Sequence, residues 1–333
     1  MEKLVEIKDL KKYYPIGRKR IDGKTEDVTL KAIDNLSFQI YKGENLGIVG
    51  ESGCGKSTLG RCLLKLIEHT QGQIIFDQED ISTYSMSRMR GLRREMQMVF
   101  QNPYSSFNPK KTIGRSLKDV AGFYGLKGNA AKERIYQLLD YVNLEKTVMG
   151  RLSNELSGGQ LQRLAIVRAL IPNPKFLVAD EPVSALDVSV QAQILNLLYD
   201  MKEEFGLTMM FISHELTVVE HICDRVMVMY LGSMVEIGTT EELFGNSMHP
   251  YTKALIASKP KDHPDEEKEK VPLTGEIPSP MDIPSGCRFS TRCPHCMPGI
   301  CTAEEPPLYP VADGHWVACH LAKSVSEKFQ SGV

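Results

Sequence analysis

Residues 50–58 have the composition and order of a loop that binds phosphate. They read GESGCGKST, which fits the pattern G-x-x-x-x-G-K-[ST] between a short apolar run and a helical pattern. Glycines allow backbone N–H groups to wrap around phosphate oxygens, and the start of a helix adds partial positive charge. The pattern therefore predicts a nucleoside triphosphate site, in which Lys56 reaches the β- and γ-phosphates and Ser57 binds Mg²⁺. The predicted contacts are Gly50, Glu51, Ser52, Gly53, Cys54, Gly55, Lys56, Ser57 and Thr58. A glycine turn without a ligand is the structural alternative.

Two adjacent acids, Asp180 and Glu181, follow the apolar run Phe176–Ala179. A buried strand would deliver both carboxylates to its carboxyl end, where Asp180 holds Mg²⁺ through water, as the corresponding acid of P-loop NTPases does. Glu181 would point to the other face and polarise the water that attacks the γ-phosphate. Two acids that merely end a strand before Pro182 are the structural alternative, which the phosphate loop disfavours.

A second glycine pair stands at the start of a helical pattern, in the segment LSGGQ. Ser157 suits a helix N-cap, and the two glycines expose backbone N–H groups at a helix N-terminus, which makes an anion site without a lysine. This segment is the signature sequence of the ABC ATPase family, which the chain resembles. The resemblance implies that it holds the γ-phosphate bound to a second subunit across a dimer interface, through Ser157, Gly158, Gly159 and Gln160. A plain helix cap is the structural alternative.

Further residues follow the order of the same family. Gln101 resembles the Q-loop glutamine, which senses Mg²⁺ and water and faces the membrane subunits. The SALD segment that ends at Asp187 resembles the D-loop, and His214 resembles the switch histidine that contacts the γ-phosphate. Tyr14 stands where the family places an aromatic ring that stacks on adenine, although its neighbour Tyr13, or a packing role, is an alternative. The resemblance thus implies a catalytic set of Glu181, His214 and Gln101, and a Mg²⁺ set of Ser57, Gln101 and Asp180.

Short apolar runs alternate with helical patterns between these motifs, which predicts a doubly wound α/β core. The predicted strands are 4–10, 30–40, 45–49, a segment near 74, 96–101, 176–179, 207–213 and, near the sheet edge, 226–237. The predicted helices are 56–67, 86–96, much of 112–150, a helix from Ser157 that stops before Pro172, and 188–205. The resemblance implies a P-loop NTPase fold of the ABC type, with a RecA-like core and a helical subdomain at 102–165.

The composition changes at Lys259. Residues 259–284 are highly charged and punctuated by proline, without an apolar face, which predicts a solvated linker. The predicted organisation is therefore a nucleotide-binding domain at 1–258, this linker, and a Cys-rich C-terminal domain at 285–333.

The segments beyond the core resemble the oligopeptide/dipeptide importers, a subfamily of ABC systems. The resemblance rests on HPYT at 249–252, GEIPSP at 275–280 and CRFSTRCP at 287–294, while STLGR and MVFQNPYSSFNP are similar to its F-type ATPase subunit. It implies an ATPase that powers peptide import from the cytoplasmic face of the membrane, as a peripheral subunit. The implied partners are a second, D-type ATPase subunit in a heterodimer, two transmembrane permease subunits and an extracytoplasmic peptide-binding protein. Nickel, glutathione and antimicrobial-peptide systems share the subfamily and remain alternatives.

Five of the eight cysteines lie between residues 287 and 319. In a cytosolic chain such a cluster indicates metal binding or catalysis rather than disulfides. The spacing suits Zn²⁺ about as well as an iron–sulfur cluster, and free thiols are a third possibility. A small tail with few apolar residues needs a staple to fold, which favours metal. The resemblance selects a [4Fe–4S] cluster on Cys287, Cys293, Cys301 and Cys319, with Cys296 as an additional candidate ligand.

Bulk composition excludes other classes. In 333 residues the apolar fraction is 42%, the charged fraction 25% and the net charge −2, which is typical of a globular protein and argues against a nucleic-acid partner. No run approaches the roughly 18 apolar residues of a membrane-spanning helix, and the N-terminus lacks the apolar region of a secretory signal. An ABC ATPase of DNA repair or translation would need a coiled coil, a second cassette or a basic surface. A metal sensor with a merely regulatory P-loop is disfavoured by Glu181 and His214.

Overall fold

The computed structural model describes residues 1–21, 24–259 and 275–331. The chain forms two compact units. The signature unit comprises residues 1–2, 41–44 and 83–212, and the phosphate-loop unit comprises residues 3–40, 45–82 and 213–333. Most of the linker predicted at 259–284 lies outside the described residues.

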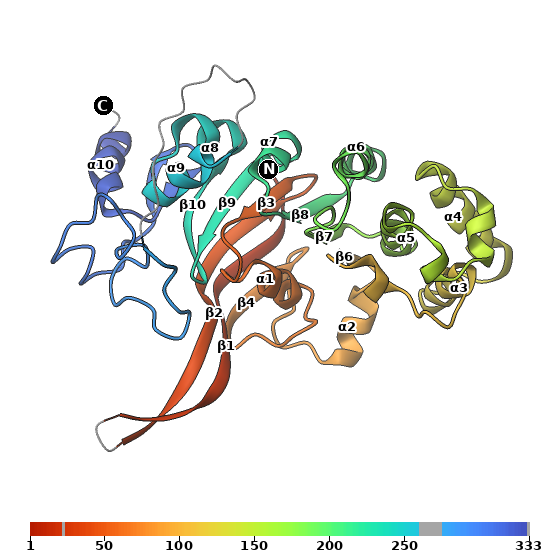
Figure 1. Cartoon of the computed structure of the whole chain (residues 1–333), viewed down its shortest axis with the longest axis horizontal. Helices are drawn as coiled ribbons and strands as arrows, with labels where there is room; N and C mark the ends of the chain where they lie inside the picture. Colours follow the sequence, from red (N-terminus) through yellow and green to blue (C-terminus); the bar gives the residue numbers. More distant parts are fainter. Residues whose placement is uncertain (22–23, 260–274, 332–333) are drawn as a thin grey trace. The chain divides into compact units, whose positions relative to one another are not determined.

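An antiparallel sheet with the strand order β2-β1-β4-β5 forms one part of the phosphate-loop unit (Figure 1). Its strands are β1 (Lys3–Ile21), β2 (Lys24–Tyr41), β4 (Gln71–Phe76) and β5 (Glu79–Asp80). Val5 and Ile7 of β1 are buried and stand opposite Phe76 and Ile74 of β4. The period of two residues puts these apolar side chains on one face, which explains why β1 and β2 form strands.

The second sheet of this unit carries the phosphate loop. Strand β3 (Asn45–Val49) is buried along its whole length and runs parallel to β9 (Arg225–Tyr230), whose other neighbour is the antiparallel β10 (Ser233–Thr239) (Figure 1). The helices of the unit before the tail are α1 (Lys56–Leu63), α7 (Leu216–Ile222), α8 (Thr240–Asn246) and α9 (Pro250–Ala257). Since β3 is fully buried and ends at Val49, directly before Gly50, the phosphate loop starts from a rigid strand.

The C-terminal tail continues this sheet beyond β10. Strand β12 (His315–Val317) pairs antiparallel with β10, and β11 (Tyr309–Ala312) pairs with β12. A 3-10 turn at His320–Ala322 then leads into α10 (Lys323–Ser331). The prediction that 226–237 lies near the sheet edge is therefore wrong, because two tail strands cover β10.

A buried hydrogen bond between side chains joins the tail strands to β10. Glu236 of β10 has no exposed surface, and its carboxylate lies 2.8 Å from Nε2 of His315 of β12. The same carboxylate accepts hydrogen bonds from the backbone N–H groups of Met248 and His249. A buried carboxylate needs hydrogen-bond partners, and His315 of the tail strand β12 provides one of them.

The signature unit contains three parallel strands in the order β8-β7-β6. They are β6 (Met96–Val99), β7 (Phe176–Asp180) and β8 (Thr208–Ile212). Its helices are α2 (Met86–Leu92), α3 (Ile113–Phe123), α4 (Gly128–Tyr141), α5 (Gly158–Leu170) and α6 (Val188–Phe205). Short 3-10 turns lie at Pro103–Ser106, Lys146–Gly150 and Ser153–Glu155. Figure 1 shows α3, α4 and α5 grouped in this unit, where helices were predicted at 112–150 and from Ser157.

The helix after the phosphate loop is shorter than the apolar pattern predicts, since α1 ends at Leu63 instead of residue 67. Lys65 has a φ of +46° and donates from its ammonium to the backbone oxygen of Ser82 at 2.6 Å. A left-handed residue cannot continue a right-handed helix. Helix α2 likewise ends at Leu92, because Met96 already belongs to β6.

None of the helices in the described residues has both the length and the apolar character that crossing a bilayer demands.

Candidate nucleotide site

The phosphate loop has a backbone that glycine alone accommodates at two positions. Gly50 and Gly55 have φ angles of +148° and +106°. A Cβ atom on Gly50 would lie 2.2 Å from the backbone oxygen of Met229, and one on Gly55 would lie 2.1 Å from that of Ala32. Both conformation and close backbone contact therefore require glycine here.

Lys56 is the first residue of α1 and is buried, with 5% of its surface exposed. Its ammonium donates to the backbone oxygen of Gly50 at 2.7 Å and to that of Glu51 at 3.1 Å. The cation is thus held by the loop itself, beside the N-terminus of α1, where partial positive charge gathers. Ser57 and Thr58 follow in the first turn of α1, while Ser52 and Gly53 are exposed.

Glu51 has two contacts that the sequence analysis did not predict. Its backbone N–H donates to the hydroxyl of Tyr251, and its carboxylate binds the guanidinium of Arg292. Both partners lie in the C-terminal part of the chain, so no local sequence signal links them to the phosphate loop.

His214 lies at the same end of β3 as the phosphate loop. The backbone N–H of Ser213 donates to the backbone oxygen of Ile48 at 3.2 Å, and Ile48 is the second-last residue of β3. His214 is the next residue, and its side chain is exposed. This position is suitable for a side chain that contacts a phosphate bound by the loop.

The two candidate tyrosines of β1 have different partners. Tyr13 donates its hydroxyl to the carboxylate of Asp34, and burial, followed by this hydrogen bond, raises the pKa of Tyr13. The ammonium of Lys12 lies 4.5 Å from the centre of the Tyr14 ring. Since Tyr13 is engaged within the fold, Tyr14 is the better candidate for stacking on adenine, and this role stays a prediction.

Gln101 and Glu181 meet in the signature unit. The side-chain amide of Gln101 donates to the Glu181 carboxylate at 2.7 Å, because the parallel strands β6 and β7 end side by side. Asp180 is the last residue of β7 and is 2% exposed. Glu181 has a φ of +45°, and its N–H donates to the backbone oxygen of Ile212 at 3.0 Å. A left-handed non-glycine residue held in this way is typical of a functional site.

The signature segment forms a capped helix start. The Ser157 hydroxyl accepts from the backbone N–H of Gln160 at 3.3 Å, and the Gln160 side chain accepts from the N–H of Ser157 at 3.2 Å. A Cβ atom on Gly159 would lie 2.6 Å from Val190 of α6, the helix that Asp187 precedes. A Cβ atom on Gly158 would lie 3.4 Å from Leu186, so the LSGGQ and SALD segments are packed together, and Gly159 has a packing role against α6 in addition to its predicted phosphate contact.

The C-terminal cysteines form no disulfide in the structure. Burial raises the pKa of Cys287 to about 12, and it also raises the pKa of Cys293 and Cys319, with a smaller contribution from neighbouring cysteines that include Cys301 in each case. Cys296 is close to Cys301 as well, and its pKa is raised. Across the residues that the structure describes, however, no three His, Cys, Asp or Glu side chains are arranged to hold a metal ion. The predicted metal-binding extension is therefore not found as a formed site.

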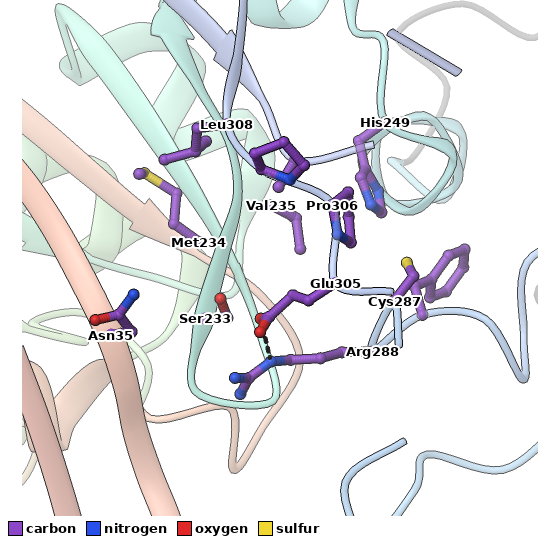
Figure 2. Close-up of a pocket in the computed structure, with 13 residues that line it drawn as sticks. Asn35, Ser233, Met234, Val235, His249, Cys287, Arg288, Glu305, Pro306 and Leu308 are labelled. Carbon is purple, nitrogen blue, oxygen red and sulfur yellow. Dashed lines mark hydrogen bonds and ion pairs between the residues drawn. The ribbon is translucent and has the colours of Figure 1, made fainter. Parts of the chain in front are cut away.

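A cavity of about 260 Å³ lies beside Cys287 (Figure 2). Its wall includes Cys287 and the ion pair between Arg288 and Glu305, whose atoms are 3.2 Å apart. Burial lowers the pKa of His249, another lining residue, to about 4. No lining residue belongs to residues 50–58, so this cavity is separate from the phosphate loop.

Solved structures with the same fold are nucleotide-binding cassettes. The dimeric cassette MJ0796 bound to ADP and Pi is 28% identical, with a TM-score of 0.63, over 71% of this chain and 99% of that one. CbiO1 from Clostridium perfringens, part of the cbiONQ ABC transporter complex, is 26% identical, with a TM-score of 0.62, over 74% and 92%. The α/β fold and the motif order define an ABC-type ATPase subunit.

Two family models match the chain: ABC transporter at residues 33–184, and oligopeptide/dipeptide transporter, C-terminal region, at residues 235–301. The oligopeptide transport ATP-binding protein AppF of Bacillus subtilis is 48% identical over 96% of this chain and 98% of its own length. The chain belongs to the oligopeptide/dipeptide family of ABC transporter ATP-binding proteins.

Proposed function

We propose that this chain hydrolyses ATP to power the import of peptides across the cytoplasmic membrane, as a peripheral subunit on the cytoplasmic face. The observation that carries the chemistry is the hydrogen bond from Gln101 to Glu181, beside the buried Asp180. This hydrogen bond holds the carboxylate of Glu181 directly after the carboxyl end of strand β7. The peptide substrate is supported by the 48% identity to an oligopeptide transport protein along almost the whole chain.

The residues divide the work of phosphoryl transfer. The N–H groups of the phosphate loop and the ammonium of Lys56 bind the β- and γ-phosphates. Ser57, Asp180 and Gln101 would hold Mg²⁺, which offsets phosphate charge when bound. Glu181 orients a water molecule and accepts its proton as the water oxygen attacks the γ-phosphorus and the bond to the β-phosphate oxygen breaks. His214 contacts the γ-phosphate, and Tyr14 stacks on the adenine.

The remaining motifs imply partners. Ser157, Gly158, Gly159 and Gln160 would contact the γ-phosphate bound to a second, D-type ATPase subunit, and Asp187 would connect the two sites. Two permease subunits and an extracytoplasmic peptide-binding protein complete the proposed complex. Nickel, glutathione or an antimicrobial peptide is the alternative cargo.

We also infer that Cys287, Cys293, Cys301 and Cys319 bind a [4Fe–4S] cluster, with Zn²⁺ as the alternative and Cys296 as a possible substitute ligand. Support comes from the proximity of neighbouring cysteines, which, after burial, contributes to the raised pKa of Cys287 and of Cys319. A bound metal would stabilise the thiolates. Iron, sulfide and zinc are to be quantified on anaerobically purified protein. A Cys293→Ser variant should lose the metal, and protein without stoichiometric iron or zinc would overturn this inference.

The test of the ATPase assignment is Glu181→Gln, which keeps the shape of the side chain but removes the base. We expect ATP binding to persist and hydrolysis to fall by about 10²–10⁴-fold. Glu133→Gln, an exposed carboxylate on α4, is the matched control and should hydrolyse ATP normally. Hydrolysis by Glu181→Gln within threefold of the wild type would refute the role of Glu181.

The substrate is tested in proteoliposomes that contain the complete transporter. Peptide-loaded binding protein should stimulate ATP hydrolysis and peptide uptake together, while Ni²⁺ and glutathione should not. Stimulation by either of these alone would assign the chain to a different transport system.

A further inference from the structure

Arg292 of the C-terminal tail binds the carboxylate of Glu51 through both terminal nitrogens of its guanidinium group. Nη1 of Arg292 lies 2.7 Å from Oε2 of Glu51, and Nη2 lies 3.0 Å from Oε1. Arg292 is 5% exposed, and hydrogen bonding to Glu51 raises its pKa. Two parallel charge-assisted hydrogen bonds fix both the position and the orientation of a carboxylate, and such bonds are roughly twice as strong as neutral ones.

The backbone of Glu51 is held by a second residue, Tyr251 of α9, which precedes the tail in the sequence. The hydroxyl of Tyr251 accepts from the Glu51 N–H at 2.9 Å. Tyr251 has no exposed surface, and its ring packs against Tyr230 at 4.7 Å and Phe289 at 5.4 Å between ring centres. A hydroxyl carried on a ring packed in this way has little freedom to move away from the loop.

These contacts act on the peptide group that positions Lys56, the proposed phosphate-binding lysine. The peptide between Gly50 and Glu51 donates its N–H to Tyr251, while its oxygen accepts from Lys56 at 2.7 Å. The orientation of this one peptide thus determines where the Lys56 ammonium is held. Arg292 also neutralises a carboxylate in the loop that must bind the negatively charged triphosphate.

We propose that Arg292 is a positioning residue of the nucleotide site, through which the C-terminal tail sets the affinity of the phosphate loop for ATP. This inference rests on the proposed ATP site and adds to it a residue outside the cassette match at 33–184. Tyr251 and Arg292 both lie in the segment matched by the oligopeptide/dipeptide C-terminal region. One function of that region is therefore to hold the phosphate loop in its conformation through Tyr251 and Arg292.

Arg288 provides a matched control for a purely structural role of the tail. Its guanidinium is 7% exposed, and it donates to Asp34 at 2.8 Å, to the backbone oxygen of Leu231 at 2.6 Å and to Glu305 at 3.2 Å. It anchors the tail as extensively as Arg292 does, but none of its partners belongs to residues 50–58. Loss of Arg288 should therefore weaken the fold without acting directly on the loop.

The experiment compares variants of the full chain by equilibrium binding of a fluorescent ATP analogue, by steady-state hydrolysis and by thermal unfolding. Arg292→Ala should raise the Kd and the KM for ATP by about 10-fold or more, with kcat within about threefold of the wild type. Arg292→Lys keeps the charge and should recover part of the affinity, which guards against a misfolded alanine variant. Arg288→Ala should lower the Tm but leave the Kd for ATP within about twofold.

A double variant distinguishes the effect of an unpaired charge on Glu51 from the effect of losing the contact between Arg292 and Glu51. In Glu51→Gln/Arg292→Ala the unpaired carboxylate is gone, so the Kd should lie closer to that of the wild type than in Arg292→Ala alone. The proposal is overturned if Arg292→Ala binds ATP within twofold of the wild type, or if Arg288→Ala weakens binding equally. If the wild type itself fails to bind ATP, the proposed function fails instead, and Lys56→Ala in the same assay identifies that outcome.

Discussion

Two glycines of the phosphate loop provide a graded test of its geometry. Gly53 has a φ of +81°, and a Cβ atom on it would meet nothing within 4 Å. Gly55 has a φ of +106°, and its Cβ atom would lie 2.1 Å from the backbone oxygen of Ala32. Gly53→Ala should therefore introduce conformational strain alone, of about 1–2 kcal/mol. Gly55→Ala should add an overlap with a strand backbone that cannot rotate away, for a total of about 2–5 kcal/mol.

The measurement is thermal unfolding by calorimetry, with binding of a fluorescent ATP analogue as the second readout. At about 2 °C per kcal/mol for a chain of this size, Gly53→Ala should lower the Tm by about 2–4 °C and Gly55→Ala by about 4–10 °C. ATP affinity should fall more in Gly55→Ala, because Lys56 follows Gly55 directly. Equal Tm values for the two variants, within 1 °C, would show that the contact with Ala32 does not constrain the loop.

Three further predictions concern other parts of the molecule. Tyr14→Ala should raise the Kd for ATP by about 10-fold through loss of stacking, whereas Tyr14→Phe should bind normally; equal affinities of both variants would exclude stacking. The pKa of His249 is about 4 in the folded state and about 6.5 when unfolded, so its contribution to stability is full above pH 6.5 and is lost as the pH falls toward 4. Between pH 7 and pH 5 the free energy of unfolding of the wild type should fall by about 2 kcal/mol more than that of His249→Asn, a variant that keeps a helix-capping acceptor. Chemical unfolding at each pH measures this difference, and parallel pH profiles of the two proteins would contradict the prediction. Gly159→Ala should destabilise the chain by about 1–3 kcal/mol, because its Cβ atom would lie 2.6 Å from Val190. Gly158→Ala, with its closest contact at 3.4 Å, should have a free energy of unfolding within about 0.5 kcal/mol of the wild type, and chemical unfolding measures both variants.

Features with a local cause were predictable from the sequence. The buried run Phe176–Ala179 forms β7, and Val188–Phe205 forms α6 with the predicted bounds. Gln101 and Glu181 also meet, because their strands are parallel neighbours whose carboxyl ends coincide. In each case the pattern within a short segment, or the general geometry of a parallel sheet, contains the information.

Contacts between distant residues were not predictable in this way. Glu51 is separated by 200 residues from Tyr251 and by 241 from Arg292, so neither contact leaves a periodic or local signal. Strands β11 and β12 are only four and three residues long, and the pairing of β12 with β10 is accompanied by the buried contact between Glu236 and His315. Such short strands have no recognisable alternation on their own.

The two arginines of the tail bind carboxylates in different parts of the phosphate-loop unit. Arg292 holds Glu51 at the phosphate loop, whereas Arg288 binds Asp34, which also accepts the hydroxyl of Tyr13. Tyr13 immediately precedes the predicted adenine-stacking residue on β1. One turn of the tail is therefore bonded both to strand β2, through Asp34, and to the phosphate loop, through Glu51. Because each arginine is buried and bonded to a carboxylate, a displacement of the tail would leave unpaired charges at Asp34 and at Glu51, and only the second of these residues belongs to the phosphate loop.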